Sequence, residues 1–117
     1  MRFRFALSAA LPLMLVAPSA FAQDRVASSE IVSGNYTSAE TTLQAELRKH
    51  PGEPELLLNL AAVYIGTGRE AEARGLYAQV LRQRDVVMDV SATRTLGSHA
   101  VAMNGLKRLQ ANQLSAR

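Results

Sequence analysis

Cysteine and tryptophan are absent from this chain of 117 residues, and each absence excludes a class of site. Without cysteine there is no disulfide, no thiolate metal site, no cysteine nucleophile and no lipid-modified anchor. Phenylalanine is scarce as well: all three lie within the first 21 residues, and the rest of the chain has only three tyrosines as aromatic residues. Because single-stranded nucleic acids bind on stacked aromatic side chains, we expect no nucleic-acid partner.

The first 22 residues have the three parts of a secretory signal peptide. Arg2 and Arg4 form a positive start, an apolar run follows over residues 5–16, and an Ala-Phe-Ala sequence ends at Ala22. An N-terminal membrane anchor is the alternative, but the apolar run is shorter than the ~20 residues that a membrane span needs. We therefore expect cleavage after Ala22, export to the periplasm, and no stable membrane insertion of the remaining chain.

Cleavage also removes most of the excess positive charge. The chain carries 13 Lys and Arg against 10 Asp and Glu, and two of the thirteen lie in the signal segment, which leaves 11 against 10. A nearly neutral chain without a long basic run does not favour binding to nucleic acid or to an anionic membrane.

Residue patterns that carry chemistry are also missing. The two histidines, His50 and His99, lie in unrelated segments and have no metal-ligand spacing. The glycines around residue 67 are not followed by the Lys-Ser/Thr pair of a phosphate-binding loop, and no G-x-S-x-G sequence is present. We therefore expect no enzyme, no cofactor and no metal.

Apolar residues recur at helical spacing in three segments, over residues 37–50, 54–66 and 69–84. The first of these helices should end at Pro51, because proline lacks the N–H group and crowds the preceding turn. The middle helix is apolar almost all round, which predicts burial on more than one side. Gly68 should close the turn into the third helix.

The pattern changes after Asp85. Residues 86–90 are rich in β-branched side chains and could pair with residues 94–96, which predicts a short hairpin. Ser98 is a suitable N-cap for a last helix that reaches about Asn112.

Two pairs of small residues stand 34 positions apart: Gly34 with Gly68, and Ala39 with Ala73. This is the period of the tetratricopeptide repeat (TPR), and the chain resembles about one and a half such repeats. The residues that carry the resemblance are Gly34, Tyr36, Ala39, Leu43 and Pro51 in a half repeat, then Leu57, Leu60, Ala61, Tyr64, Gly68, Ala73, Tyr77 and Val80 in a full repeat over residues 54–87. A different three-helix arrangement is the alternative.

The resemblance implies an all-α fold of antiparallel helix hairpins that binds a protein or peptide partner. In the family, the first helix of each repeat lines a concave groove. By register, the residues that point there are Glu55, Leu58, Asn59, Ala62, Ile65 and Gly66. Of these, we predict Leu58, Asn59, Ala62 and Ile65 to bind the partner. Asn59 stands where many peptide-binding members have an asparagine that grips the peptide backbone, whereas the basic residues of a carboxylate clamp are missing. This favours an apolar groove for a helix or an extended hydrophobic segment. The alternative is that the chain's own N-terminal segment or last helix fills the groove.

About three repeats are usually needed for a stable stack, and this chain has only one and a half. The face of the helix over residues 69–84 therefore needs a cover, supplied by the tail as a cap or by a second copy in a homo-oligomer. We expect four parts: a signal peptide (1–22), a flexible N-terminal segment (23–33), a TPR-like domain (34–87), and a C-terminal cap and tail (88–117).

Overall fold

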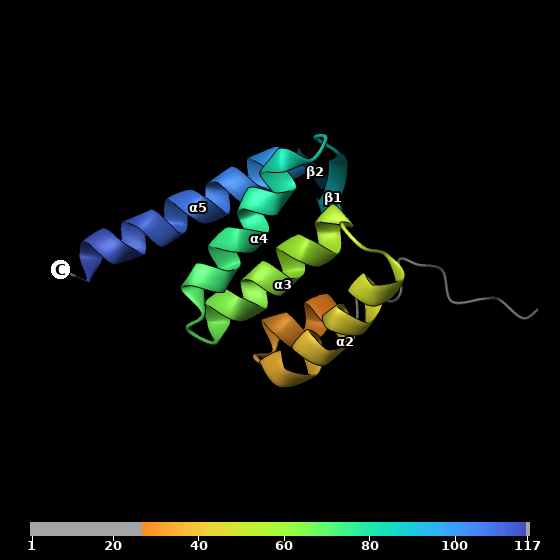
Figure 1. Ribbon diagram of the computed structural model, residues 1–117, viewed down its shortest axis with the longest axis horizontal. Helices are drawn as coiled ribbons and strands as arrows, with labels where there is room; N and C mark the ends of the chain where they lie inside the picture. Colours follow the sequence, from red (N-terminus) through yellow and green to blue (C-terminus); the bar gives the residue numbers. More distant parts are fainter. Residues whose placement is uncertain (1–26, 117) are drawn as a thin grey trace, which may run out of the picture.

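The structure, a computed structural model, describes residues 27–116, so the predicted signal peptide lies outside the described residues. A short helix over residues 27–32 comes first. The elements that follow are α2 (Tyr36–Lys49), α3 (Pro54–Gly66), α4 (Glu70–Arg82), β1 (Val87–Ser91), β2 (Arg94–Gly97) and α5 (Ser98–Ser115) (Figure 1). This order confirms the all-α prediction, with a short hairpin and a helix after the repeat.

Residues 27–32, the described part of the N-terminal segment that precedes the turn at Gly34, form a short helix. They are helical because Ala27 and Ile31, four positions apart, lie on one face and pack into an apolar cluster with Leu43 and Leu60. Ala27 keeps only 2% of its surface exposed. At the other boundary, the division expected after residue 87 falls inside β1.

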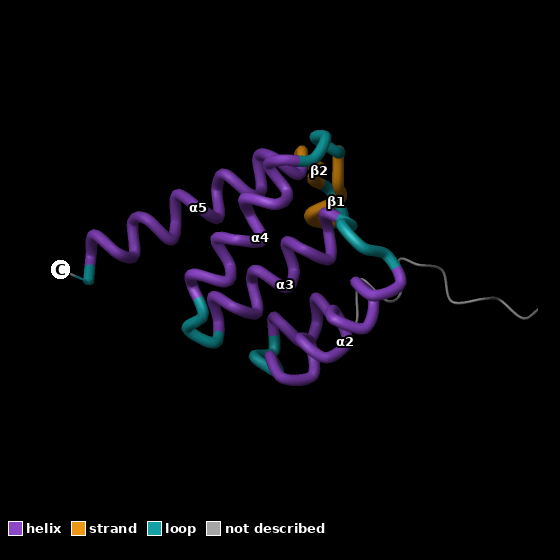
Figure 2. The backbone as a smooth tube through the Cα atoms, viewed as in Figure 1, coloured by secondary structure: helices purple, strands orange, loops and turns teal. Residues whose placement is uncertain are grey.

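The helices lie side by side in chain order, as the backbone tube in Figure 2 shows, with α2 against α3, α3 against α4, and α4 against α5. Three tight turns with left-handed glycines connect the short helix, α2, α3 and α4: Gly34 precedes α2, Gly52 precedes α3 and Gly68 precedes α4. Gly34 and Gly68 both have φ near +80° (80° and 77°), a conformation that favours glycine. The 34-residue spacing of these two glycines therefore reflects the same backbone turn, formed once in each repeat.

The central helix α3 divides the core into two apolar clusters, as its all-round apolar sequence predicts. Its buried residues are Leu56, Leu57, Leu58, Leu60, Ala61 and Val63. One cluster lies between α3, α2 and the short helix, and the other between α3, α4 and α5. Alanines with no exposed surface stand at each helix contact, namely Ala39, Ala61, Ala73 and Ala102, so the backbones approach closely.

Two of the glycines inside helices lie directly beneath tyrosine rings. A Cβ atom on Gly66 of α3 would overlap the ring of Tyr36, and one on Gly105 of α5 would overlap the ring of Tyr77. Gly75 in α4 differs, because nothing lies within 4 Å of the place its Cβ would take. Gly105 therefore allows α5 to approach α4 closely. Gly75 lies on the exposed surface of α4, where the absence of a side chain serves no contact.

A hydrogen-bonded junction connects α4, the hairpin and α5. Ser98, predicted as the N-cap, is instead the first residue of α5 and has no exposed surface. Its hydroxyl donates to Asp85 Oδ1 (3.3 Å) and accepts from the amide N–H of Val86 (3.0 Å). Asp85 Oδ1 also accepts from the amide N–H of His99 (3.0 Å), and this bond lowers the pKa of the Asp85 carboxyl. The side chain that caps α5 thus comes from before the hairpin.

Candidate functional site

The four predicted partner-binding residues lie along one side of α3 but differ in burial. Leu58 is buried, with 7% of its surface exposed, whereas Asn59, Ala62 and Ile65 are half-buried. Leu58 belongs to the apolar cluster that includes Ala102 and Leu109 of α5, and Ile65 packs against the same cluster. The chain's own last helix therefore covers part of the apolar side of α3.

Beside Leu58 and Asn59 there is a hollow of about 160 Å³. Glu55 of α3 also lines it, and the remaining walls come from three separate parts of the chain: Ser28, residues 88–90 of β1, and Val101 of α5. Ala62 and Ile65 lie further along α3 and do not line this hollow. Sequence reasoning missed the β1 wall, although the β-branched run that predicts the strand was visible.

A larger groove of about 620 Å³ borders β1 along its length, and we call it the β1 groove. It is lined by residues 86–92, by Glu53 and Glu55 at the start of α3, and by Ser28. Its lining in the described part of the chain contains no Lys or Arg, and it includes the acidic side chains of Glu53 and Asp89. The potential in the β1 groove therefore favours a cationic ligand.

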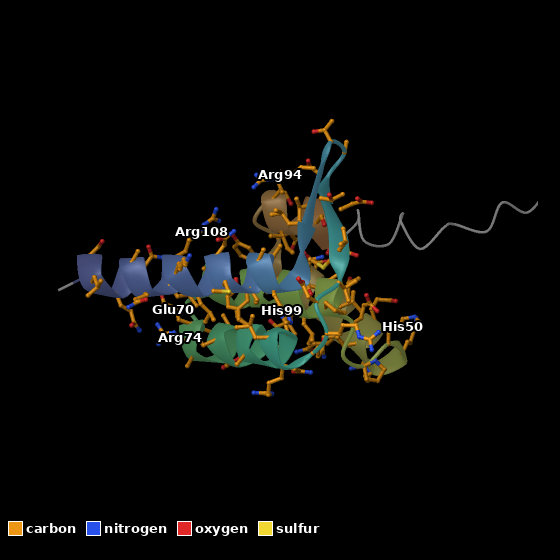
Figure 3. All side chains as sticks on the ribbon, turned by 90° about the horizontal axis from the view of Figure 1, so that it is seen from above. His50, Glu70, Arg74, Arg94, His99 and Arg108 are labelled. Carbon is orange, nitrogen blue, oxygen red and sulfur yellow. The ribbon has the colours of Figure 1, made fainter. Side chains whose placement is uncertain are left out.

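The hairpin stands off the helices when the molecule is seen from above (Figure 3). β1 and β2 pair antiparallel, with Met88 opposite Leu96 and Asp89 opposite Thr95, and the register is irregular between Asp89 and Ser91. The described sheet has two strands, so the far edge of β1 has no strand beside it. An open strand edge presents unpaired N–H and C=O groups and can pair with another chain.

A different cluster fastens α2 to the turn between α3 and α4. Arg69 Nη2 lies 2.6 Å from Glu40 Oε2, and the guanidinium is 4.2 Å from the centre of the Tyr64 ring. The hydrogen bond to Glu40 raises the pKa of Arg69, which stays charged in any case. Each of these groups has a partner within the fold, so the cluster is structural.

Ser98, His99 and Asp85 are the residue types of a nucleophilic triad, but they are not arranged as one. His99 Nε2 lies 2.7 Å from the carbonyl oxygen of Gln83, and the hydroxyl of Ser98 is bound to Asp85. No group of three or more acidic or histidine side chains between residues 27 and 116 could hold a metal ion. Over the same residues, no helix has the length and apolar character needed to cross a bilayer.

Residues 31–86 match the tetratricopeptide repeat family. This segment belongs to the tetratricopeptide repeat family. The comparisons with curated proteins and with solved structures gave no match. Within the TPR segment, α3 and α4 form the full repeat and α2 forms the second helix of the preceding one. The match ends at residue 86, directly before β1, so the hairpin and α5 lie beyond it.

Proposed function

We propose that this chain is an exported TPR adaptor that holds a protein partner against the α3 side through Leu58, Asn59, Ala62 and Ile65. TPR repeats generally mediate interactions between proteins, and the family match covers the helix that carries these residues. The observation that carries the proposal is the hollow beside Leu58 and Asn59, on the first helix of the full repeat. The proposal includes no catalytic step.

The four residues would contribute differently to binding. Leu58 forms part of the apolar floor of the hollow. Because it is buried, a charged residue in its place would destabilise the core as well as weaken binding of a partner. Asn59 is half-buried and lines the hollow, and its amide can both donate and accept a hydrogen bond. Ala62 is half-buried one turn further on, where a large side chain would obstruct a partner.

Crosslinking in living cells tests this proposal. A photoreactive amino acid in place of Asn59 should capture a protein partner, and mass spectrometry should identify it. Ala62→Glu should abolish the capture and leave the melting curve unchanged. Ala71→Glu is the matched control, because it makes the same change at an exposed position of α4. Equal loss with both variants would contradict recognition through α3.

A second function has an observation in its favour. Leu58 is 7% exposed and shares its cluster with Ala102 and Leu109 of α5, as in a self-capped structural domain without an external ligand. In that case, crosslinking from position 59 should join it to α5 of the same chain or of a second copy. The size of the crosslinked product separates these two outcomes from capture of a partner.

The export part of the proposal has its own test. N-terminal sequencing of the protein from the periplasmic fraction should begin at Gln23, because the Ala-Phe-Ala sequence ends at Ala22. A soluble protein that begins at Met1 would contradict export and would leave the interaction proposal in place.

A further inference from the structure

We propose that the open edge of β1 accepts an extended, basic segment of the partner protein as a third strand, which lies in the β1 groove. This inference rests on the proposed interaction function and adds the chemistry of the partner. The strand belongs to the part of the chain beyond the TPR match.

The peptide groups of β1 point alternately toward β2 and toward the open edge. The amide N–H of Ser98 donates to the carbonyl oxygen of Val86 (2.7 Å), so this carbonyl faces the β2 side. Because the peptide groups of antiparallel strands alternate in direction, those of Val87 and Asp89 face the open edge. Across residues 27–116, neither takes part in a hydrogen bond outside the hairpin. Their N–H and C=O groups are available to a further strand.

The β1 groove follows the whole length of the strand. Consecutive residues from Val86 to Ala92 line it. Successive side chains of a strand point to opposite faces, so a groove on one face would border only every second residue. Because the β1 groove borders every residue, it runs along the edge of the strand. β1 has 5 residues, and at roughly 3.3 Å per residue the edge can pair with a segment of similar length.

Charge selects the occupant. Asp89 lies at the middle of β1, and Glu53 faces the same groove from the start of α3. A segment with Lys or Arg complements both carboxylates. A second copy of this chain does not, because full-length antiparallel pairing of β1 with β1 is centred on Asp89 and would place the two Asp89 side chains opposite each other, and facing like charges are destabilising.

Peptide selection tests the inference. A random dodecapeptide library displayed on phage is selected against the full chain recovered from cells. We expect enriched peptides with net positive charge, whose binding weakens as salt rises. Asp89→Lys and Glu53→Lys should each weaken binding of the best synthetic peptide by about tenfold or more. Glu70→Lys is the control, because it makes the same change of charge on α4, away from the hairpin (Figure 3).

Backbone methylation of the peptide then tests strand pairing on the unaltered protein. In a peptide paired with β1, only every second residue directs its N–H group toward the strand. N-methylation of these residues should abolish binding, and N-methylation of the residues between them should leave binding intact. Equal effects of both sets, or no enrichment of basic peptides, would overturn the inference. Binding that is lost with Ala62→Glu but kept with Asp89→Lys would overturn it as well, and would leave the proposed function standing. A dimer in sedimentation that depends on β1 would assign the edge to a second copy and reject the inference.

Discussion

The packing of α5 on the repeat can be tested by a single substitution, Leu109→Ala. Leu109 has no exposed surface and lies in the second half of α5, the helix whose C-terminal end extends past the other helices (Figure 1). It packs in one cluster with Ala73, Tyr77 and Val80 of α4. Its side chain therefore anchors the far half of α5 to the repeat.

The expected loss of stability follows from the atoms removed. Leu109→Ala deletes three carbons, and at about 0.8 kcal/mol per buried CH₂ the transfer cost is roughly 2.4 kcal/mol. The cavity that remains raises the cost, and buried Leu→Ala substitutions span about 2–5 kcal/mol. We expect roughly 2.5–3.5 kcal/mol, the transfer cost with a moderate contribution from the cavity. For a domain of this size, that lowers the melting temperature by about 10–25 °C.

Urea titration followed by circular dichroism measures the change in the free energy of unfolding. Leu114→Ala is the control on the same helix, because Leu114 is 67% exposed and should change stability by less than about 0.5 kcal/mol. A similarly small change for Leu109→Ala would refute the reasoning. It would mean that α5 does not pack on α4 in solution and that the cap is not part of the fold.

Three further substitutions follow from the contacts. Gly75→Ala should raise the free energy of unfolding by about 0.5–1 kcal/mol, because its Cβ meets open space in a helix. Gly105→Ala should lower it by about 1–3 kcal/mol, because its Cβ overlaps the Tyr77 ring, and an equal gain at both glycines in urea titration would contradict this. Asp85→Asn tests pH dependence: the N–H of His99 lowers the pKa of Asp85 below its ordinary 3.8, so the ionised form stabilises the fold above that value. This stabilisation is lost as pH falls through the lower folded pKa, so Asp85→Asn should flatten the acid side of the stability curve, and parallel curves would contradict it.

The helices and turns of the TPR segment could be predicted because they depend on local chemistry. Pro54 begins α3 and Gly68 closes the turn after it, each through its own backbone geometry. The pairs Gly34 with Gly68 and Ala39 with Ala73 preserve the 34-residue period, which only a repeated unit explains. The family match over residues 31–86 confirms this part of the prediction.

The cap of α5 could not be assigned from its own sequence. Ser98 is a good N-cap residue, yet the carboxylate that accepts from the N–H of His99 belongs to Asp85, which precedes the hairpin. A helix start can take its acceptor from any segment that the fold brings near. The register of β1 on β2 brings Asp85 to this position, and register depends on the whole hairpin.

The candidate site shows the same division between local and tertiary causes. Helical periodicity by itself places Leu58, Asn59, Ala62 and Ile65 along one side of α3, since the spacing of side chains on a helix is fixed by its geometry. Which of them stays accessible depends on α5, which buries Leu58, and on β1, which forms a wall beside Asn59. Burial and groove shape are sums of contacts between segments far apart in the chain, so only the tertiary structure could decide them.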